Sequence, residues 1–395
     1  MNKQYLDNIR DKKILIWGFG REGKSTKSFL ERNNITSQIE VFEGPRDGFN
    51  IDDYDVVFKS PGIPYLEKEE KITSQTELFM GMFRDQIIGI TGTKGKSTTS
   101  SLMHHVIGEC SDYKTVLVGN IGFPCLDMFE EIDDNTIVVY ELSCHQLNNI
   151  TVSPHIGIFL NLYEDHLDYY KTREKYFAAK CGITNNQKEN DYLIMGVDVP
   201  QLSTKANTIT ISDVEPIKLQ IKGEHNVFNA NVVKRVAVDI LGCDGAAVDK
   251  SLYDFTGLAH RLQRIGVVDG VEYYDDSIST IPEATIRATN SIPNAATVLV
   301  GGMDRNIDYS KLISFIKEKD DINFVCMYAS GKRIYNEVAD RDNVVLVENL
   351  EQAVQCAKEK TKPGSACVLS PAAASYDSFK NFEERGDVFK QIVGL

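Results

Sequence analysis

Long apolar runs are missing from this 395-residue sequence. No stretch approaches the roughly 18 uninterrupted apolar residues that a membrane-spanning helix requires. Residues 1–13, MNKQYLDNIRDKK, contain no apolar core of the kind that a secretory signal needs. We therefore expect a cytoplasmic protein without a membrane span.

Paired cysteines are also missing, and prolines are few. The eight cysteines are scattered without a C-x-x-C pair, which argues against both a disulfide framework and a zinc knuckle. Eleven prolines, 28 glycines and 42% hydrophobic residues are ordinary for a globular protein and argue against a long disordered or fibrous segment. At about 150 residues per domain, the chain should form two or three folded units.

Positive charge is in deficit. Lysine and arginine number 43 against 57 aspartate and glutamate residues, which gives a net charge of -14. Such a chain repels a phosphate backbone unless its basic residues are concentrated at one site. We therefore expect no nucleic-acid partner.

β-branched runs alternate with helical patterns along the chain, as is typical of parallel sheets with crossover helices. The pattern predicts an α/β protein built from three blocks, with domains at 1–85, 86–259 and 260–395. The last block is predicted to open with a hairpin in which Asp269 and Gly270 supply the turn. Further strands are expected near 14–17, 39–42, 56–58, 87–90, 115–119, 136–142, 155–161, 296–301, 324–328, 344–347 and 366–369.

The strongest local signal is the glycine-rich run 89–98, GITGTKGKST, between a hydrophobic strand and a helical stretch. Glycines allow backbone N–H groups to surround phosphate oxygens, Lys96 can neutralise their charge, and the hydroxyl of Ser97 can reach Mg²⁺. The spacing departs from G-x-x-x-x-G-K-[ST], because Ile90 stands five positions before Gly95. The alternative is a tight glycine turn with a solvated lysine.

A second glycine-rich element, Gly18, Gly20 and Gly23 in G-x-G-x-x-G, follows the first predicted strand, and Glu43 lies about 20 residues further on. Taken alone, this pattern is compatible with a dinucleotide cofactor, with another nucleotide diphosphate at the helix N-terminus, or with a structural turn.

Acidic and imidazole groups follow strands in the second block. Glu141 and His166 each come just after a predicted strand, at the carboxyl edge where open α/β sheets bind ligands. Beside a phosphate loop, they are candidate ligands for a second metal ion. Arg261, at the start of the third block, could reach a γ-phosphate or form a surface salt bridge.

Ordered motifs extend this pattern over essentially the whole chain, which resembles the Mur ligase family. The segments that carry the resemblance are 92–98, 141–147, 161–168, 178–180, 223–229, 260–261 and 369–383.

The resemblance implies three domains: a Rossmann-like one for a UDP group, a central P-loop ATPase-like one, and a Rossmann-like one for the incoming amino acid. It further implies ATP-dependent ligation of glutamate, D-glutamate favoured, to UDP-N-acetylmuramoyl-L-alanine through an acyl phosphate, in peptidoglycan precursor synthesis. Two Mg²⁺ ions and a monomeric enzyme are expected.

The resemblance also implies residue roles. Catalytic roles fall to Lys96, His166, Lys180 and Arg261. ATP would be held by Gly92, Thr93, Lys94, Gly95, Lys96, Ser97, Thr98, Asn226, Asn229, Arg261 and Asp276. Metal ligands would be Ser97, Glu141, His166 and Lys180. The UDP-sugar and glutamate would contact Gly18, Gly20, Gly23, Glu43, Ser60, Asn120, Thr280, Arg305, Ser375 and Phe382.

Lys180 matches the lysine that the family carries as a carbamate. A neutral buried amine reacts with CO₂ to give an anionic oxygen ligand, which a lysine cation cannot provide. Without the resemblance, Lys180 would be interpreted as a snorkelling lysine on a helix.

Two departures from the family pattern stand out. The interval between Lys180 and Gly223 is short, so part of the central domain's small sheet is expected to be missing. The family's D-S-K-A-T-N run reads D-S-I-S-T-I at 276–281, and a minor group of related ligases that add L-glutamate resembles this version. L-glutamate is therefore the alternative substrate.

Other functional classes remain open. A dehydrogenase could use residues 18–23 for NAD, although no obvious hydride-site acid or base accompanies them. A non-enzymatic ATP-dependent regulator would leave Glu141, His166 and Lys180 unexplained. Folylpolyglutamate synthetases share the ATPase motifs but lack the separate N-terminal block at 13–60.

Overall fold

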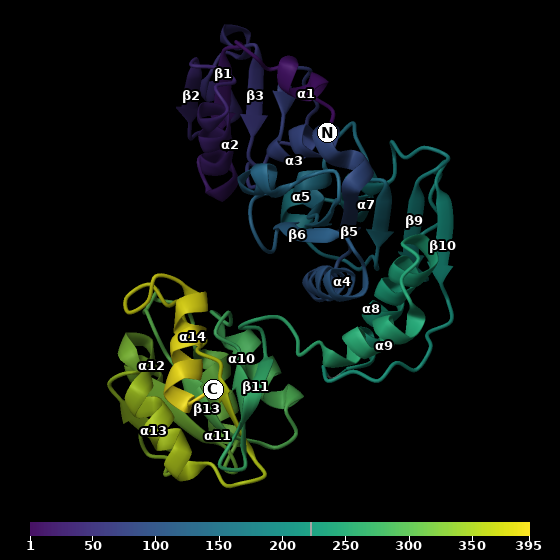
Figure 1. Cartoon of the computed structure of the whole chain (residues 1–395). Helices are drawn as coiled ribbons and strands as arrows, with labels where there is room; N and C mark the ends of the chain where they lie inside the picture. The colour runs from purple at the N-terminus through teal and green to yellow at the C-terminus, as the bar shows by residue number, and fades with distance from the viewer. Residues whose placement is uncertain (222) are drawn as a thin grey trace. The chain divides into compact units, whose positions relative to one another are not determined.

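The computed structural model describes residues 1–221 and 223–395, without the side chain of Asp168. It divides the chain into two compact units, Met1–Phe255 and Thr256–Leu395. The first unit contains two parallel sheets and the second contains one mixed sheet (Figure 1). The predicted α/β class is confirmed.

The N-terminal sheet is parallel, with strand order β2-β1-β3-β4. Its elements are α1 (Gln4–Asp7), β1 (Ile14–Trp17), α2 (Arg21–Arg32), β2 (Ile39–Phe42), β3 (Val56–Lys59) and β4 (Ile72–Thr73). β1 is apolar throughout because both of its faces are covered: Ile16 faces Phe29 of α2, whereas Trp17 packs with Val57 on the other side. The chain leaves β1 for β2 and returns to β3, so the strand order reverses between β1 and β3, which is the position where open α/β sheets bind ligands.

The central sheet is also parallel, with strand order β10-β9-β8-β5-β7-β6. Its strands are β5 (Ile87–Thr91), β6 (Lys114–Gly119), β7 (Thr136–Glu141), β8 (Ile156–Phe159), β9 (Tyr192–Gly196) and β10 (Asn207–Ile211). Its helices are α4 (Lys96–Cys110), α5 (Cys144–Leu147), α6 (Leu167–Tyr170), α7 (Arg173–Lys180), α8 (Glu224–Arg235) and α9 (Gly245–Asp254). α4, α8 and α9 pack their apolar side chains on one face.

Helix α3 (Gln75–Phe83) joins the two sheets of the first unit. All of its residues except Glu77 are buried, and Leu78, Phe79 and Met80 share one hydrophobic cluster with residues of both sheets. A helix that is apolar on all sides is stable only when it is covered on all sides. This shared core makes residues 1–255 one compact unit, while the predicted boundary at 85/86 remains a prediction.

The C-terminal sheet has strand order β11-β12-β16-β13-β14-β15, with an antiparallel hairpin followed by parallel pairs. Its strands are β11 (Gln263–Val268), β12 (Val271–Asp275), β13 (Ala295–Val300), β14 (Asn323–Met327), β15 (Val344–Val347) and β16 (Ala366–Leu369). Its helices are α10 (Pro282–Ser291), α11 (Ser310–Glu318), α12 (Tyr328–Asn336), α13 (Leu350–Lys360) and α14 (Phe382–Val393). The hairpin turns at Asp269 and Gly270, as predicted.

The short interval after Lys180 contributes strands to the central sheet. Within residues 181–221 the structure has two strands, β9 and β10, and both belong to the main central sheet. No separate small sheet occurs in this described range.

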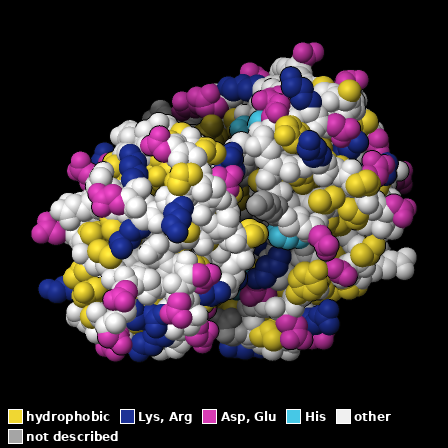
Figure 2. Space-filling view, turned by 90° about the horizontal axis from the view of Figure 1, so that it is seen from below, with side chains coloured by type: hydrophobic (Ala, Val, Ile, Leu, Met, Phe, Trp, Pro, Cys, Tyr) yellow, Lys and Arg dark blue, Asp and Glu magenta, His cyan; other side chains and the backbone are white. Residues whose placement is uncertain are grey.

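No helix in the described part of the chain is long and apolar enough to cross a membrane. On the face shown in Figure 2, acidic and basic side chains are interspersed.

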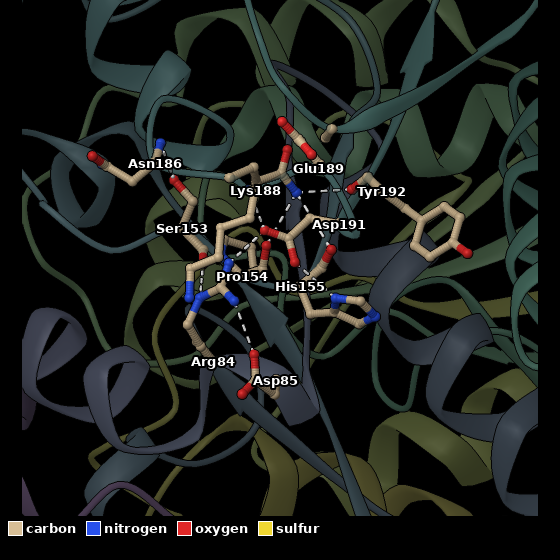
Figure 3. Close-up of polar contacts among 12 residues, drawn as sticks. Arg84, Asp85, Ser153, Pro154, His155, Asn186, Lys188, Glu189, Asp191 and Tyr192 are labelled. Carbon is tan, nitrogen blue, oxygen red and sulfur yellow. Dashed lines mark hydrogen bonds and ion pairs between the residues drawn. The ribbon is translucent and has the colours of Figure 1, made fainter.

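A buried polar network fixes the amino ends of β5, β8 and β9 (Figure 3). The Asp191 carboxylate accepts hydrogen bonds from Arg84 Nη2 at 2.5 Å and from the Lys188 backbone N–H at 2.5 Å, and it pairs with His155 Nδ1 at 2.8 Å. Burial acts to raise the pKa of Asp191, but the hydrogen bonds from Lys188, His155 and Arg84 outweigh it and lower the pKa. This network lies at the edge of the sheet opposite to the carboxyl ends of the strands.

Replacing Asp191 with asparagine should lower the free energy of unfolding by about 3 kcal/mol, because it leaves the Arg84 guanidinium without its buried counter-charge. The lowered folded-state pKa means that the wild-type contribution is complete above the unfolded pKa of about 3.9 and is lost as the pH falls through the folded-state pKa. The difference between the two proteins should therefore shrink below a pH of about 4.

Urea unfolding, followed by the fluorescence of Trp17, measures this effect. Trp17 is the single tryptophan of the chain and lies in the same unit as Asp191. The matched control is Asp85→Asn, which removes the exposed partner of the same arginine and should change stability by less than about 0.5 kcal/mol. Equal effects of both substitutions would contradict the prediction.

Candidate active site

The loop between β5 and α4 has the form of a phosphate-binding loop. Gly95 precedes the first residue of α4 and adopts φ 84°, a left-handed conformation that glycine accommodates without strain. The loop ends at the N-terminus of a 15-residue helix, where unpaired N–H groups and the helix dipole favour an anion. Ser97 and Thr98 lie partly exposed in the first turn, where the prediction requires them.

Asn161, which follows β8, holds the shape of this loop. Its Oδ1 accepts hydrogen bonds from the backbone N–H groups of Thr93 at 3.1 Å and Lys94 at 2.9 Å, and its Nδ2 donates to the Lys94 carbonyl at 3.1 Å. The sequence motif contained Asn161, but no role could be given to it because the contact spans 67 residues. The Lys94 side chain is exposed and pairs with Asp165 at 3.3 Å.

Two lysines from different elements converge on one carbonyl group of the loop. Lys96 Nζ donates to the Gly92 carbonyl at 3.0 Å and to the Thr93 carbonyl at 3.1 Å. Lys180 Nζ, at the end of α7, donates to the same Gly92 carbonyl at 2.8 Å. The structure therefore brings together the two lysines to which catalytic roles were assigned.

Lys180 is almost wholly buried, with 1% of its surface exposed. Burial lowers the pKa of its amine to about 7, and neighbouring Lys96 adds to this shift. Its Nζ also lies 4.8 Å from the centre of the Tyr176 ring. An amine in this setting is uncharged in a large fraction of molecules near neutral pH, which a solvated helix lysine is not.

Glu141, at the carboxyl end of β7, is fully buried near Lys96. Its Oε1 accepts a hydrogen bond from Asn120 Nδ2 at 2.9 Å, whereas its buried Oε2 has no hydrogen-bond partner among the described residues. Leaving a buried carboxylate oxygen unpaired is costly, and a cation would satisfy it. Asn120 was predicted to contact the muramoyl substrate, and here its side chain orients Glu141.

His166 lies exposed at the start of α6, in an aromatic cluster beside the phosphate loop. Its ring centre is 5.0 Å from that of His145 and 6.1 Å from that of Tyr176. The Tyr176 hydroxyl in turn lies 3.2 Å from Thr93 Oγ1 in the loop. Among the described residues, no group of three or more His, Cys, Asp and Glu side chains could hold a metal ion.

Asn226 and Asn229 lie buried on α8, where the first residues of the helix approach the phosphate loop. A Cβ added at Gly95 would stand 3.0 Å from Asn229 Oδ1, and Asn229 Nδ2 donates to Asn226 Oδ1 at 3.3 Å. The family resemblance implied that both residues contact the nucleotide, and in the structure Asn229 lies beside the phosphate loop.

The second glycine-rich loop connects β1 to α2. Gly23 allows α2 to approach this loop closely, because a Cβ there would lie 2.1 Å from the Gly18 carbonyl oxygen. Ser60, after β3, donates its hydroxyl to the same carbonyl at 2.8 Å. Gly20 is the residue that precedes α2, and Glu43 is exposed after the end of β2.

Sequence reasoning missed the charged residues beside this loop. A cavity of about 330 Å³ is lined in part by Glu22, Lys59, His145 and Gln146. Gln146 Nε2 donates to Glu22 Oε1 at 2.7 Å, which links α2 to the segment after β7. Burial lowers the pKa of Lys59 to about 8 although Glu22 opposes the shift. The signal was present, since Glu22 belongs to the G-x-G-x-x-G run and Lys59 precedes Ser60.

In the C-terminal unit, Arg261 is exposed and Asp276 is buried. Asp276 accepts hydrogen bonds from Ser279 Oγ at 2.5 Å, Ser370 Oγ at 2.7 Å and the Leu262 N–H at 3.0 Å. Burial raises its pKa to about 6, although the two serines oppose the shift. In this structure Asp276 therefore fixes the loop that follows β12.

The four residues predicted to contact glutamate come from separate segments of this unit. Thr280 follows β12, Arg305 is exposed after β13, Ser375 is buried after β16, and Phe382 begins α14. Met303 N–H donates to the Ala374 carbonyl at 2.9 Å, so the segments that carry Arg305 and Ser375 are neighbours.

Comparisons with known proteins point to one family. The family model of the Mur ligase middle domain matches residues 90–236, which include the phosphate loop, Glu141, His166 and Lys180. The UDP-N-acetylmuramoylalanine--D-glutamate ligase of Aquifex aeolicus is 33% identical, and the match covers 97% of this chain and 99% of that enzyme. The enzyme of the same name from Bacillus cereus is 33% identical, with 98% of each chain covered.

Solved structures show the same fold. The UDP-N-acetylmuramate-alanine ligase MurC of Thermotoga maritima matches with a TM-score of 0.54 at 17% identity, covering 96% of this chain and 98% of that one. MurF of Thermotoga maritima, solved in complex with ADP, matches with a TM-score of 0.53 at 15% identity, covering 98% and 96%. With relatives one third identical over nearly its full length, this chain belongs to the Mur ligase family.

Proposed function

We propose that this protein is an ATP-dependent ligase that joins D-glutamate to UDP-N-acetylmuramoyl-L-alanine and releases ADP and phosphate. The observation that carries the proposal is the convergence of Lys96 and Lys180 on the Gly92 carbonyl at the start of a phosphate loop, close to the buried carboxylate of Glu141. The names of the full-length relatives support the choice of substrates. The reaction uses ATP and a nucleotide-activated precursor, which suits an enzyme of the cytoplasm.

The chemistry follows from the low reactivity of a carboxylate toward an amine. An oxygen of the alanyl carboxylate attacks the γ-phosphorus of ATP, the bond to the bridging oxygen breaks, and ADP leaves. The glutamate amine then attacks the carbonyl carbon of the acyl phosphate, loses a proton, and displaces phosphate through a tetrahedral oxyanion. Lys96, once turned from its loop carbonyls to the triphosphate, offsets the charge that develops in the first step.

The residues around the loop fit a Mg²⁺ site. Glu141 Oε2 is buried and unpaired within the described residues, and hard oxygen ligands suit this ion. Ser97, His166 and a modified Lys180 would complete the ligand sets of two ions. When bound, Mg²⁺ neutralises phosphate charge. Asn120 fixes the orientation of the Glu141 carboxylate through its hydrogen bond to Oε1.

Lys180 is proposed to act as a carbamate. Its uncharged amine adds to CO₂, forming an N–C bond and releasing one proton, and the product carries one negative charge shared between two oxygens. Three features support this: the amine is buried, its pKa is lowered to about 7, and its hydrogen bond goes to a carbonyl. A lysine cation at the same place would repel Mg²⁺.

The remaining predicted residues would hold the substrates. The diphosphate of the UDP-sugar would lie at the N-terminus of α2, against Gly18, Gly20, Gly23 and Ser60, with Glu43 at the nucleotide and Asn120 toward the muramoyl group. Arg261 and Asp276 would contribute to ATP from the C-terminal unit. Thr280, Arg305, Ser375 and Phe382 would hold glutamate, with the Arg305 guanidinium on a carboxylate.

The preferred enantiomer is a separate prediction. We expect kcat/KM to be higher for D-glutamate, in line with the names of the relatives, although Ile278 replaces the lysine of the family's D-S-K-A-T-N run. A phosphate-release assay with UDP-N-acetylmuramoyl-L-alanine, ATP and either enantiomer measures the ratio. Reactions without glutamate serve as the control.

A ratio above about 100 in favour of L-glutamate, equivalent to about 2.7 kcal/mol of transition-state discrimination, would reverse the choice of enantiomer. No glutamate-dependent phosphate release with either enantiomer would overturn the proposed function itself.

A further inference from the structure

Arg385, in the second turn of α14, is a buried cation that none of the roles above uses. Its side chain is fully buried, and each of its three guanidinium nitrogens donates hydrogen bonds. Nε donates to Ser277 Oγ at 2.9 Å, and Nη2 donates to the carbonyls of Ser277 at 2.7 Å and Ala373 at 3.1 Å. Nη1 donates to the carbonyls of Ala373 at 3.1 Å and Ala374 at 3.4 Å.

These acceptors lie on the segments that carry the proposed glutamate contacts. Ser277 stands three residues before Thr280, and the Ala373 and Ala374 carbonyls precede Ser375. A Cβ added at Gly302, three residues before Arg305, would lie 3.0 Å from Arg385 Nη1. Ser277 Oγ also donates to the Phe382 carbonyl at 2.8 Å. One guanidinium therefore stands where the four segments meet.

Burial of this charge needs an explanation. Burial lowers the pKa of Arg385 to about 10, so the side chain is charged at neutral pH. Its hydrogen bonds go to neutral carbonyl and hydroxyl groups, while the buried carboxylate of Asp275 nearby offsets part of its charge. A buried charge is expensive unless its geometry is well satisfied. The planar fork of arginine reaches Ser277 Oγ and the carbonyls of Ser277, Ala373 and Ala374 from three nitrogens, whereas a lysine offers one ammonium nitrogen.

We propose that Arg385 is a positioning residue for the amino-acid substrate, which sets the spacing of the loops that bind the two carboxylates of glutamate. The inference rests on the proposed function. Glutamate is small and carries charge at both ends, so its affinity depends on where the loops place Thr280, Arg305 and Ser375. A shift of about 1 Å in one of these segments is enough to lose productive binding.

The other side of the same loop is held by hydrogen bonds that do not use the Arg385 guanidinium, and one carboxylate among them, Asp275, lies close enough to Arg385 to interact with its charge. Leu262 N–H donates to Asp276 Oδ1 at 3.0 Å, and Ile278 N–H donates to the His260 carbonyl at 3.0 Å. Asp275 Oδ2 lies 2.7 Å from His260 Nδ1. These contacts fix the residues on both sides of Arg261, the proposed ATP contact. Loss of Arg385 should therefore impair glutamate binding while formation of the acyl phosphate continues.

The test compares Arg385→Lys and Arg385→Met with the wild-type protein. We expect both variants to raise KM for glutamate at least tenfold, with KM for ATP and for UDP-N-acetylmuramoyl-L-alanine changed less than twofold. Without glutamate, acyl phosphate trapped by borohydride reduction should form at the wild-type rate. Ser277→Ala, which removes one hydrogen bond of the set, should raise KM for glutamate about threefold and provides the test if the other variants do not fold.

Arg341→Lys is the matched control, because Arg341 belongs to the same unit and pairs with Asp320 far along the chain from the glutamate segments. It should leave every KM unchanged. A similar rise in all three KM values, together with slower formation of the acyl phosphate, would show a merely structural role and overturn the proposal. An unchanged KM for glutamate in the variants would overturn it as well.

The wild-type protein separates the two hypotheses. If it shows glutamate-dependent turnover and the variants bind glutamate normally, only the role of Arg385 fails. If the wild-type protein shows no such turnover, the proposed function fails and the role of Arg385 fails with it.

Discussion

Lys96→Ala should abolish turnover, with a loss in kcat/KM that corresponds to at least about 3 kcal/mol, or more than 100-fold. The reason is that Lys96 lies at the first position of α4 beside the loop glycines and is half-buried near Glu141, where it can reach a bound triphosphate. A charge-assisted contact that strengthens as the phosphoryl group transfers lowers the barrier, whereas a solvated lysine would contribute almost nothing.

The effect is measured by the rate of phosphate release as ATP is titrated, with the other two substrates at saturating concentrations. Lys114→Ala is the control, because Lys114 is an exposed lysine of the same unit that pairs with Glu131. It should retain activity within twofold. Thermal unfolding of the Lys96 variant should show a folded protein, and a folded variant that keeps most of its rate would refute the assignment.

Lys180→Ala should also be nearly inactive, with a loss of at least about 100-fold, because it removes the anionic oxygens that the carbamate would supply. Acetate or formate should restore part of the activity, since a short carboxylate fits the space left by the side chain. The same salts should not restore Lys96→Ala, which lacks a cation.

The alternative outcome is equally clear. Rescue of Lys180→Ala by short alkylamines would mean that a cation acts at this position and that no carbamate forms. Lys175→Ala, which replaces an exposed lysine of the same helix, controls for general effects on α7 and should remain active.

In the wild-type protein the amine must be uncharged to add CO₂, so carbamate formation should increase as the pH rises through about 7, the pKa of Lys180.

The sequence predicted parts of the site where the reactive residues and the strand, turn or helix that holds them lie within a few residues of each other. The run from Gly92 to Thr98 could be interpreted because a hydrophobic strand, glycines and a helix start occur in order within a few residues. Most strands of the three sheets were predictable from their hydrophobic runs, whereas β4, β9 and β10 were not predicted. The G-x-G-x-x-G loop was less specific, because the same turn serves NAD and any other diphosphate, and only the full-length relatives decide in favour of a ligase.

The remaining site residues depend on contacts that span long intervals of the chain. Lys180 reaches Gly92 across 88 residues, and Arg385 reaches Ser277 across 108. No periodicity or spacing rule connects such positions. A resemblance to a family could supply Lys180, but Arg385 carries no chemistry by itself, and its role is visible only once the fold brings four segments together.

The burial of α3 has a consequence for substrate choice. To tilt the N-terminal sheet away from the central one, the molecule would have to expose Phe79, Met80 and their neighbours to water, at about 1.5–3 kcal/mol for each large side chain. The loops at Gly18 and Gly92 therefore belong to one compact unit whose shared core opposes such a movement. Under the proposed function, the span between these loops would select precursors by the separation of the diphosphate and the terminal carboxylate.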